Sequence, residues 1–339
     1  MATTTRRKSI QAAAFLVGTV LGFSALAQTR EVVIGYQDMV VPWRHAQETR
    51  EVEKRTGYKV TYRKLGSGSE VVRALASGAI HIGEAGSSPF ASAISQGVPI
   101  EVFWVLDNIN DAEALVARNG SGVNTLAELK GKKIGLPFVS TTHFHALVAL
   151  QDAGVDPKSV QIVNLRPPEI LAAWERGDID ATFVWDPVLA KAKTNGKVII
   201  TSGQIAAKTG KATFDGLAVT KAFAKEHDGF LAQFVQVLAD ADKAYTGHKA
   251  AWTAESAEVK SLAKWSGAEA PTVPASLALY AFVSPAEQAS NQWLGGGKDS
   301  GVAKSLAATA AFLKEQGTIQ NVLPDYAVGV NPAWVRRAK

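Results

Sequence analysis

The sequence predicts an α/β protein in which mostly parallel sheets are covered on both faces by helices. The first observation is that short apolar, strand-like runs alternate with helix-like runs from residue 31 to about residue 221. The second is that turns rich in Gly, Pro or Ser separate these runs, as they do in β-α-β units. The third is length, because a chain of 339 residues can form two lobes with separate cores.

The strand-like runs define the predicted sheets. In chain order they cover 31–36, 59–65, 79–85, 100–106, 113–118, 132–138, 160–165, 179–185, 197–201 and 216–221. Helices are predicted between them, ending near residue 55 and covering 66–78, the segment after Gly86–Pro89, about 141–154, 169–177 and 188–196. From about residue 222 to the end the chain is mostly helical and Ala-rich.

Residues 1–27 have the pattern of an export signal. Arg6, Arg7 and Lys8 form a basic start, an apolar run extends from about residue 10 to residue 26, and Ala25-Leu26-Ala27 supplies small residues for cleavage. A membrane anchor is the alternative, but the apolar run is short and rich in Ala and Gly. The pair of arginines also hints at twin-arginine export. We therefore expect a periplasmic protein.

Composition excludes several classes of site. The chain contains no Cys, so disulfides, thiol nucleophiles and thiolate metal sites are ruled out. Without the three basic residues of the signal, the net charge falls from +5 to +2. This value gives no support for binding to nucleic acid or to a membrane surface.

Three turns have the composition of anion sites at helix N-termini. Gly86-Ser87-Ser88-Pro89 joins a strand to a short helix, with a serine as the N-cap and Pro89 in the first turn. Similar turns lie at 139–142 and at Ser67-Gly68. Free backbone N–H groups and the helix dipole attract an anion at such a turn. The alternative is that the hydroxyl groups merely cap their own helices.

Several segments of the sequence resemble those of a known protein family. The chain resembles the nitrate/sulfonate-binding group of periplasmic substrate-binding proteins, and within it those of taurine ABC transporters. The similarity covers nearly all of residues 28–339, and it rests on VRALASG (72–78), GSSP (86–89), VPIEVF (98–103), PFVSTTH (137–143), the long segment 163–185 and FLKEQG (312–317).

The resemblance implies a class II periplasmic-binding fold of two lobes joined by two crossover strands. Lobe 1 would contain 28–116 and 222–339, and lobe 2 would contain 117–221, with the crossovers near 114–118 and 216–221. It also implies a monomer without enzymatic activity, cofactor or metal. Such a protein binds taurine or a related amino-sulfonate and delivers it to an inner-membrane permease with a cytoplasmic ATPase.

The resemblance also assigns candidate ligand residues. For the sulfonate they are Ser67, Gly68, Ser87, Ser88, Thr141 and Thr142. For the ammonium group they are Asp215, as the carboxylate, and Trp185, through a cation–π contact, with Tyr36 and Gln37 at the end of the first strand. The alternatives are a solvated turn residue for Asp215 and a core tryptophan for Trp185.

Four residues depart from the taurine pattern. Asp186 stands where a small residue is usual, and it either caps the next helix or adds a carboxylate. Gly216 replaces a bulky residue and would widen the pocket, while Trp43-Arg44 places a cation where it can reach an anion. Simple alkanesulfonates and nitrate-like anions therefore remain as alternative ligands.

Other functional classes fit less well. Synthases of the thiamine pyrimidine precursor share the fold, but they are cytoplasmic and carry Cys- and His-rich active sites. His143 and His145 lie two apart at a helix start, so they point to different sides and are not a metal pair. The Gly-rich turn at 66–69 lacks the Lys of a P-loop, and no G-x-S-x-G motif occurs.

Overall fold

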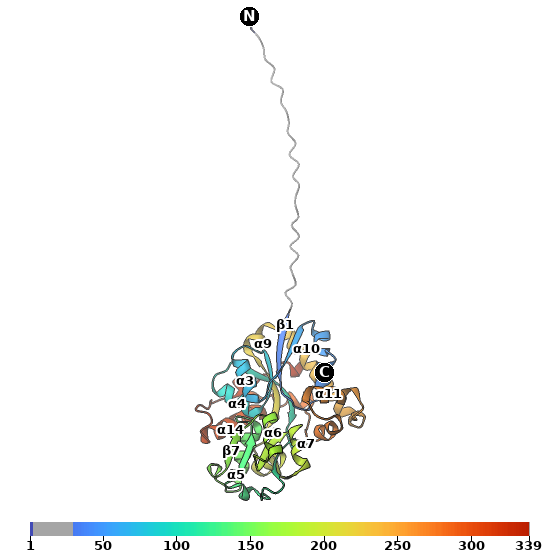
Figure 1. Ribbon diagram of the computed structural model, residues 1–339. Coiled ribbons are helices and arrows are strands. Elements are labelled where there is room, and N and C mark those ends of the chain that lie inside the picture. Colours follow the sequence, from blue (N-terminus) through green and yellow to red (C-terminus); the bar gives the residue numbers. More distant parts are fainter. Residues whose placement is uncertain (3–29, 339) are drawn as a thin grey trace.

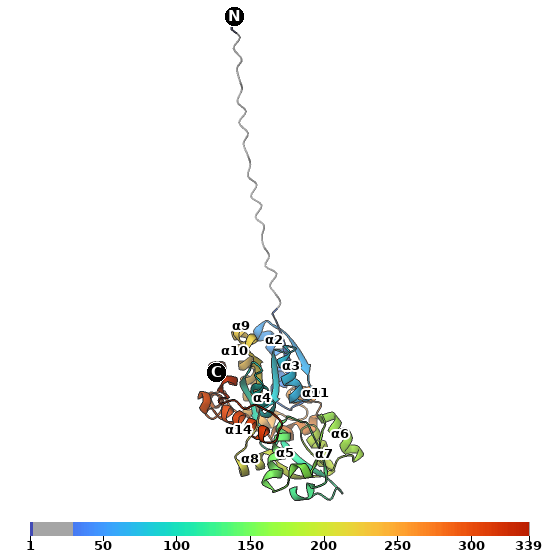
Figure 2. The ribbon, with the colours of Figure 1, turned by 90° about the vertical axis from the view of Figure 1, so that its left-hand side faces the viewer.

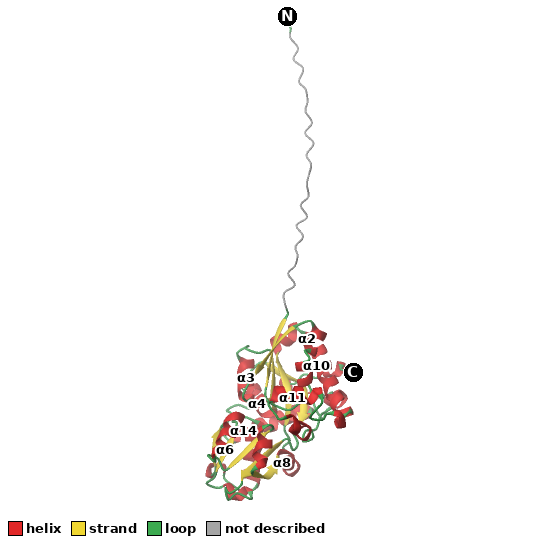
Figure 3. Ribbon diagram, turned by 45° about the vertical axis from the view of Figure 1, so that its right-hand side comes forward, coloured by secondary structure: helices red, strands yellow, loops and turns green. Residues whose placement is uncertain are grey.

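The protein consists of two five-stranded sheets, each flanked by helices. The structure is a computed structural model that describes residues 1, 2 and 30–338, so the predicted export signal lies almost wholly outside the described residues. The two sheets with their helices form an upper and a lower lobe in Figure 1, and Figure 3 shows helices on both sides of the strands. This arrangement confirms the predicted fold class.

The first sheet has the strand order β2-β1-β3-β10-β4. Its strands are β1 (Glu31–Tyr36), β2 (Lys59–Lys64), β3 (Ile82–Gly86), β4 (Ile100–Asn108) and β10 (Phe214–Thr220). The first four run in the same direction, whereas β10 is antiparallel to both of its neighbours. The sheet is therefore mostly parallel, as expected.

The second sheet repeats this plan with the order β7-β6-β8-β5-β9. Its strands are β5 (Glu113–Arg118), β6 (Lys133–Leu136), β7 (Gln161–Asn164), β8 (Ala181–Trp185) and β9 (Gly196–Thr201). Here β5 is the antiparallel strand, between β8 and β9. Strands β5 and β10 hold the equivalent position in the two sheets. Each carries a carboxylate near its start, Glu113 in β5 and Asp215 in β10.

The chain passes between the sheets twice, at 109–112 and at 210–213. By sheet membership the first lobe comprises 30–108 and 214–338, and the second comprises 113–209. Both crossings lie a few residues before the lobe limits that the resemblance implies. The strands near 114–118 and 216–221 are thus members of a sheet, and the connections just before them join the lobes.

Helices of the first lobe lie on both faces of the first sheet (Figures 1 and 2). They are α1 (Arg44–Glu48), α2 (Glu51–Thr56), α3 (Gly68–Ala76), α4 (Ser87–Ser95), α9 (Lys221–Glu226), α10 (Asp228–Gly247), α11 (Ala257–Ser266), α12 (Val273–Leu277), α13 (Pro285–Gln288) and α14 (Gly301–Glu315). No helix in the described part is long and apolar enough to cross a membrane.

The second lobe carries α5 (Thr141–Asp152), α6 (Pro167–Arg176), α7 (Val188–Thr194) and α8 (Ser202–Thr209). Its core gathers buried apolar residues of β5, β6, β8 and α5. Helix α14 of the first lobe reaches this core, because the rings of Phe312 and Phe144 lie 5.2 Å apart. This contact holds the lobes together beside the crossings.

Candidate ligand-binding site

A small cavity lies between the two lobes at the ends of the parallel strands. Its volume is about 20 Å³, enough for about one water molecule, so the lobes are closed on each other. The residues that line it are Gln37, Met39, Gly68, Gly86, Pro89, Glu113, Ser140, Thr141, Trp185 and Asp215. The structure therefore brings together five of the ten predicted ligand residues. It adds Gly86, Pro89 and Ser140, which belong to the predicted turns, and Met39 and Glu113, which sequence analysis missed.

The lobes touch each other at the edges of this cavity. The indole N–H of Trp185, at the end of β8, donates to Asp38 Oδ1 in the first lobe over 3.0 Å. Gly86 ends β3 and approaches the second lobe so closely that a Cβ there would lie 2.6 Å from Cγ2 of Thr141. Such a Cβ would also lie 3.2 Å from Asp215 Oδ1. Glycine at residue 86 thus permits closure.

Three helix N-termini lie around the cavity, as the three turns predicted. In α3 the N-cap is Ser67, whose hydroxyl accepts from the Glu70 N–H at 3.3 Å. In α5 it is Ser140, whose hydroxyl accepts from the His143 N–H at 3.0 Å. In α4 it is Gly86. The N–H of the third residue is thus capped in α3 and α5, and in α4 the third residue is Pro89, which has none, so the N–H groups of the first two residues of each helix are left for an anion.

The serine cap predicted for α4 is wrong by one residue. Because Gly86 is the N-cap, Ser87 and Ser88 are the first two residues of the helix. Both side chains are fully buried, and neither hydroxyl has a hydrogen-bond partner in the described structure. They lie next to the cavity rather than on its surface.

The two threonines of the second turn face different ways. Thr141 lines the cavity and donates its hydroxyl hydrogen to Glu113 Oε1. The hydroxyl of Thr142 lies 2.7 Å from that of Ser140 and does not reach the cavity surface. A helix turns by about 100° per residue, so these two adjacent side chains point in different directions.

Two buried carboxylates line the cavity at the starts of the antiparallel strands. Glu113 begins β5 opposite Trp185 of β8, and Asp215 lies near the start of β10 opposite Gly86 of β3. An antiparallel strand begins where its parallel neighbours end, so both carboxylates reach the cleft edge. Sequence analysis missed Glu113, although an acid at the head of an apolar strand was a visible signal.

Burial and mutual repulsion keep these acids from ionising freely. Burial raises the pKa of Glu113 to about 7, against the hydrogen bonds from Thr141 and Ser202, which lower it. Burial and the charge of Glu113 raise the pKa of Asp215 as well. Asp107 pairs with Asp215 across the sheet, and burial raises its pKa, with Asp215 adding to the shift. A cation in the cleft would relieve this repulsion.

Glu113 belongs to a hydrogen-bond chain in which every hydrogen bond forms only when the chain holds one extra proton. His145 Nε2 lies 2.8 Å from the Lys211 carbonyl oxygen, so it carries a hydrogen. His145 Nδ1 lies 2.7 Å from Ser202 Oγ, which in turn lies 3.1 Å from Glu113 Oε2. The single hydroxyl hydrogen of Ser202 cannot serve both a bare Nδ1 and a bare carboxylate.

The extra proton is therefore on Glu113 or on His145 Nδ1. Burial lowers the pKa of His145 to about 4, whereas that of Glu113 is about 7. The proton thus resides on Glu113 at mildly acidic pH. It leaves the chain when the carboxylate ionises.

The first strand contributes one of its two candidate residues. Gln37 lines the cavity, with its side-chain amide donating to the Glu84 carbonyl over 3.1 Å. Tyr36 does not line it, because its ring packs edge-on against Trp265, 5.4 Å away, and under the guanidinium of Arg44.

The residues that depart from the taurine pattern lie outside the cavity surface. Arg44 forms a fully buried ion pair with Glu84, so it does not serve as a free anion ligand. Asp186 accepts a hydrogen bond from Ser276. A Cβ on Gly216 would lie 2.9 Å from the Trp104 carbonyl oxygen, so this glycine relieves strand crowding and does not widen the cavity.

Histidines and carboxylates do not combine into a metal site in the described residues, where no group of three could hold an ion. His143 stacks on the ring of Phe138, and His145 belongs to the chain already described.

Residues 20–261 match the NMT1-like family. The taurine-binding periplasmic protein of Escherichia coli is 38% identical over 310 residues, which cover 91% of this chain and 94% of that protein. A putative aliphatic sulfonates-binding protein of the same organism is 27% identical over 211 residues, or 62% of this chain and 65% of that protein.

Solved structures share the fold. The alkanesulfonate-binding protein SsuA of Xanthomonas axonopodis pv. citri, bound to MOPS, has a TM-score of 0.72 at 24% identity, covering 91% of this chain and 98% of that one. The aliphatic sulphonate binding protein SsuA of Escherichia coli has a TM-score of 0.71 at 22% identity, covering 90% and 92%. The family match and the 38% identical relative together show that this chain belongs to the NMT1-like family.

Proposed function

We propose that this protein is the substrate-binding component of an ABC importer that captures taurine or a related amino-sulfonate between its lobes. It is exported to the periplasm and delivers its ligand to an inner-membrane permease with a cytoplasmic ATPase. It acts as a monomer and catalyses no reaction. The name of its 38% identical relative, a taurine-binding periplasmic protein, supports this ligand class.

The observation that carries the proposal is that a pair of carboxylates shares one cavity with the helix N-termini. Glu113 and Asp215 line the same small cavity as Gly68, Ser140 and Thr141. A sulfonate suits the N-terminal turns of α3, α4 and α5, because backbone N–H groups bind an anion without titrating. An ammonium group suits the carboxylates, and Trp185 adds a ring that attracts cations.

Lobe motion must accompany binding. The closed cavity of about 20 Å³ is too small for a ligand of several heavy atoms, so the lobes must part to admit it, and the side chains that line the cavity must shift as the lobes close around it. Trp185 and Gly86 lie where the lobes touch, so their contacts with the other lobe break when the lobes part.

The site has enough donors and acceptors for tight binding. Hydrogen bonds to a charged group contribute about 1.5–3 kcal/mol each, so four of them give roughly 6–12 kcal/mol before the cost of closure. Micromolar affinity needs about 8 kcal/mol. No metal is required for such an affinity.

A simple alkanesulfonate is the second candidate, favoured by the 27% identical relative named as a putative aliphatic sulfonates-binding protein. Nitrate-like anions are a further alternative. Neither has a cation for the buried carboxylates Glu113 and Asp215. The two carboxylates therefore distinguish an amino-sulfonate from both alternatives.

The test is calorimetric titration of residues 28–339 with taurine and with ethanesulfonate. We expect micromolar or tighter binding of taurine and much weaker binding of ethanesulfonate. Asp215→Asn should weaken taurine far more than ethanesulfonate, and the exposed control Asp299→Asn should change neither. Preference for ethanesulfonate, or equal losses for both ligands in Asp215→Asn, would contradict the proposal.

A further inference from the structure

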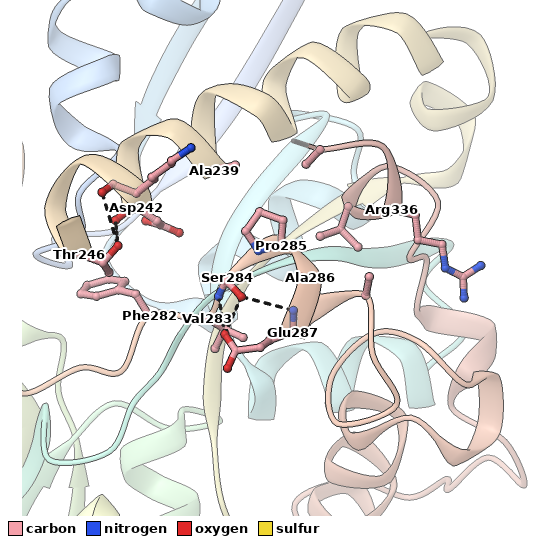
Figure 4. Close-up of a pocket in the computed structure, with 14 residues that line it drawn as sticks. Ala239, Asp242, Thr246, Phe282, Val283, Ser284, Pro285, Ala286, Glu287 and Arg336 are labelled. Atoms are coloured by element: carbon pink, nitrogen blue, oxygen red, sulfur yellow. Dashed lines mark hydrogen bonds between the residues drawn. The ribbon is translucent and has the colours of Figure 1, made fainter.

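A second, larger cavity lies in the first lobe, away from the interlobe cleft. Its volume is about 720 Å³, and it shares no lining residue with the cleft. Figure 4 shows α10 on one side, the segment 282–287 below it, and the segment that carries Arg336 on the other side. The cavity is far larger than packing defects in a protein interior, and it has the size of a small-molecule site.

Asp242 is the unusual residue in this cavity. It lies within α10, its side chain is only 8% exposed, and its Oδ2 has no hydrogen-bond partner in the described structure. Asp240, two residues earlier in the same helix, instead forms an ion pair with Arg55. A buried carboxylate oxygen without a partner is costly, so Oδ2 of Asp242 favours a cation or a proton. Burial accordingly raises the pKa of Asp242.

The other polar groups around the cavity do not supply that cation. Glu287 caps its own helix, accepting from the Ser284 N–H at 3.0 Å and from the Ser284 hydroxyl at 2.6 Å. Thr246 donates its hydroxyl hydrogen to a carbonyl of its own helix. Lys243 and Arg336 also line the cavity, but both residues are exposed. No ion pair joins either of them to Asp242 among the described residues.

The remaining walls are apolar. They are formed by Ala239, Phe282, Val283, Pro285, Ala286, Ala289, Val335 and Ala338. A ligand that fits this surface has an apolar body. The buried charged group that it meets there is the carboxylate of Asp242. The two exposed cations would favour a negative group at the outer end of the same ligand.

We propose that this cavity is a second binding site, which takes a primary amine with an apolar body and pairs its ammonium group with Asp242. The apolar chain lies against Phe282 and the alanines and valines of the walls. Because the site shares no residue with the cleft, it does not depend on the ligand proposed there.

The test uses hexylamine as the probe and the whole exported chain, residues 28–339. Binding is followed by ligand-observed NMR and by the midpoint of thermal unfolding. We expect hexylamine to bind and to raise the midpoint in the parent chain, with at least tenfold weaker binding in Asp242→Asn. Asp240→Asn, on the same helix, and Asp215→Asn, in the cleft, should both keep the parent affinity.

Two further probes define the chemistry. Hexanoate has the same chain without the ammonium group and should not bind, whereas 6-aminohexanoate should bind at least as well as hexylamine. Equal hexylamine affinity in the parent and in Asp242→Asn overturns the proposal, as does hexanoate binding as strong as that of hexylamine. Absence of hexylamine binding at 10 mM also overturns it. Unchanged circular dichroism and taurine affinity show whether Asp242→Asn folds.

Discussion

Taurine binding should release a proton from Glu113. The chain from Glu113 through Ser202 to His145 holds one extra proton, and the pKa values place it on Glu113 below about pH 7. An ammonium group beside this carboxyl favours the ionised form. We therefore vary the pH and compare the parent chain with Glu113→Gln, whose side chain keeps the shape of Glu but cannot ionise.

The magnitude follows from the pKa of about 7 for Glu113. A group that must lose one proton before the ligand binds weakens binding by up to tenfold for each pH unit below its pKa. Affinity is thus fully present above pH 7 and is lost as the pH falls through 7. The ammonium group of taurine stays protonated over this range. We expect the Kd to be about tenfold higher at pH 6 than at pH 8.

The assay is calorimetric titration at pH 6, 7 and 8, in buffers with different ionisation enthalpies, which counts the protons released. Glu113→Gln should bind taurine more weakly, with little dependence on pH. Ethanesulfonate is the control, and its affinity should fall as the pH rises, because it prefers the neutral carboxyl. A flat taurine profile in the parent chain would refute the reasoning. If the Kd of Glu113→Gln depended on pH as strongly as that of the parent chain, the released proton would come from another acid.

Three other predictions test steric and electrostatic features of the first lobe. Gly86→Ala would place a Cβ 2.6 Å from Thr141 Cγ2, so taurine affinity measured by calorimetry should fall at least tenfold; an unchanged Kd would contradict this. Arg44→Met leaves the buried carboxylate of Glu84 unpaired and should cost about 3–5 kcal/mol in urea unfolding at pH 7, whereas a loss below about 1 kcal/mol would show that the pair is dispensable. Asp107 has two carboxylate oxygens without partners in the described structure and a raised pKa, so it destabilises the folded state as the pH rises above about 4. Asp107→Asn should therefore gain stability relative to the parent by about 1–3 kcal/mol between pH 4 and pH 8, and a constant difference across that range would exclude this explanation.

The fold was largely predictable because its strands are short apolar runs between strong turn signals. The exceptions have local causes. The helix expected to end near residue 55 is broken at Arg50, which has a left-handed backbone with φ of 57°. Helix α8 was missed, although Thr201 and Gln204 form a capping box at its start. A single residue in the left-handed conformation, such as Arg50, does not change the spacing of apolar residues, so sequence analysis does not detect the end of a helix there.

The site was half predictable, and the difference lies in strand direction. Gln37, which follows the first strand, was found because the resemblance assigns it, in agreement with the rule that ligands of parallel sheets bind beyond the carboxyl ends of the strands. Glu113 was missed because that rule was applied only to carboxyl ends, whereas β5 runs antiparallel and begins at the cleft. The sequence does not state which strand is reversed. Five of the ten predicted residues do not line the cavity: Ser67, Ser87, Ser88, Thr142 and Tyr36.

Among the described residues, those that line the cleft cavity include two acids and no Lys or Arg. A sulfonate held at the turns of α3, α4 and α5 lies in the same cavity as Glu113 and Asp215. Like charges about 4 Å apart repel by about 4 kcal/mol at an effective dielectric constant of 20. A ligand without an ammonium group must accept that repulsion or protonate both acids. Because the pKa of both acids is raised, this repulsion grows as the pH rises, so discrimination against simple sulfonates and nitrate-like anions should increase with pH.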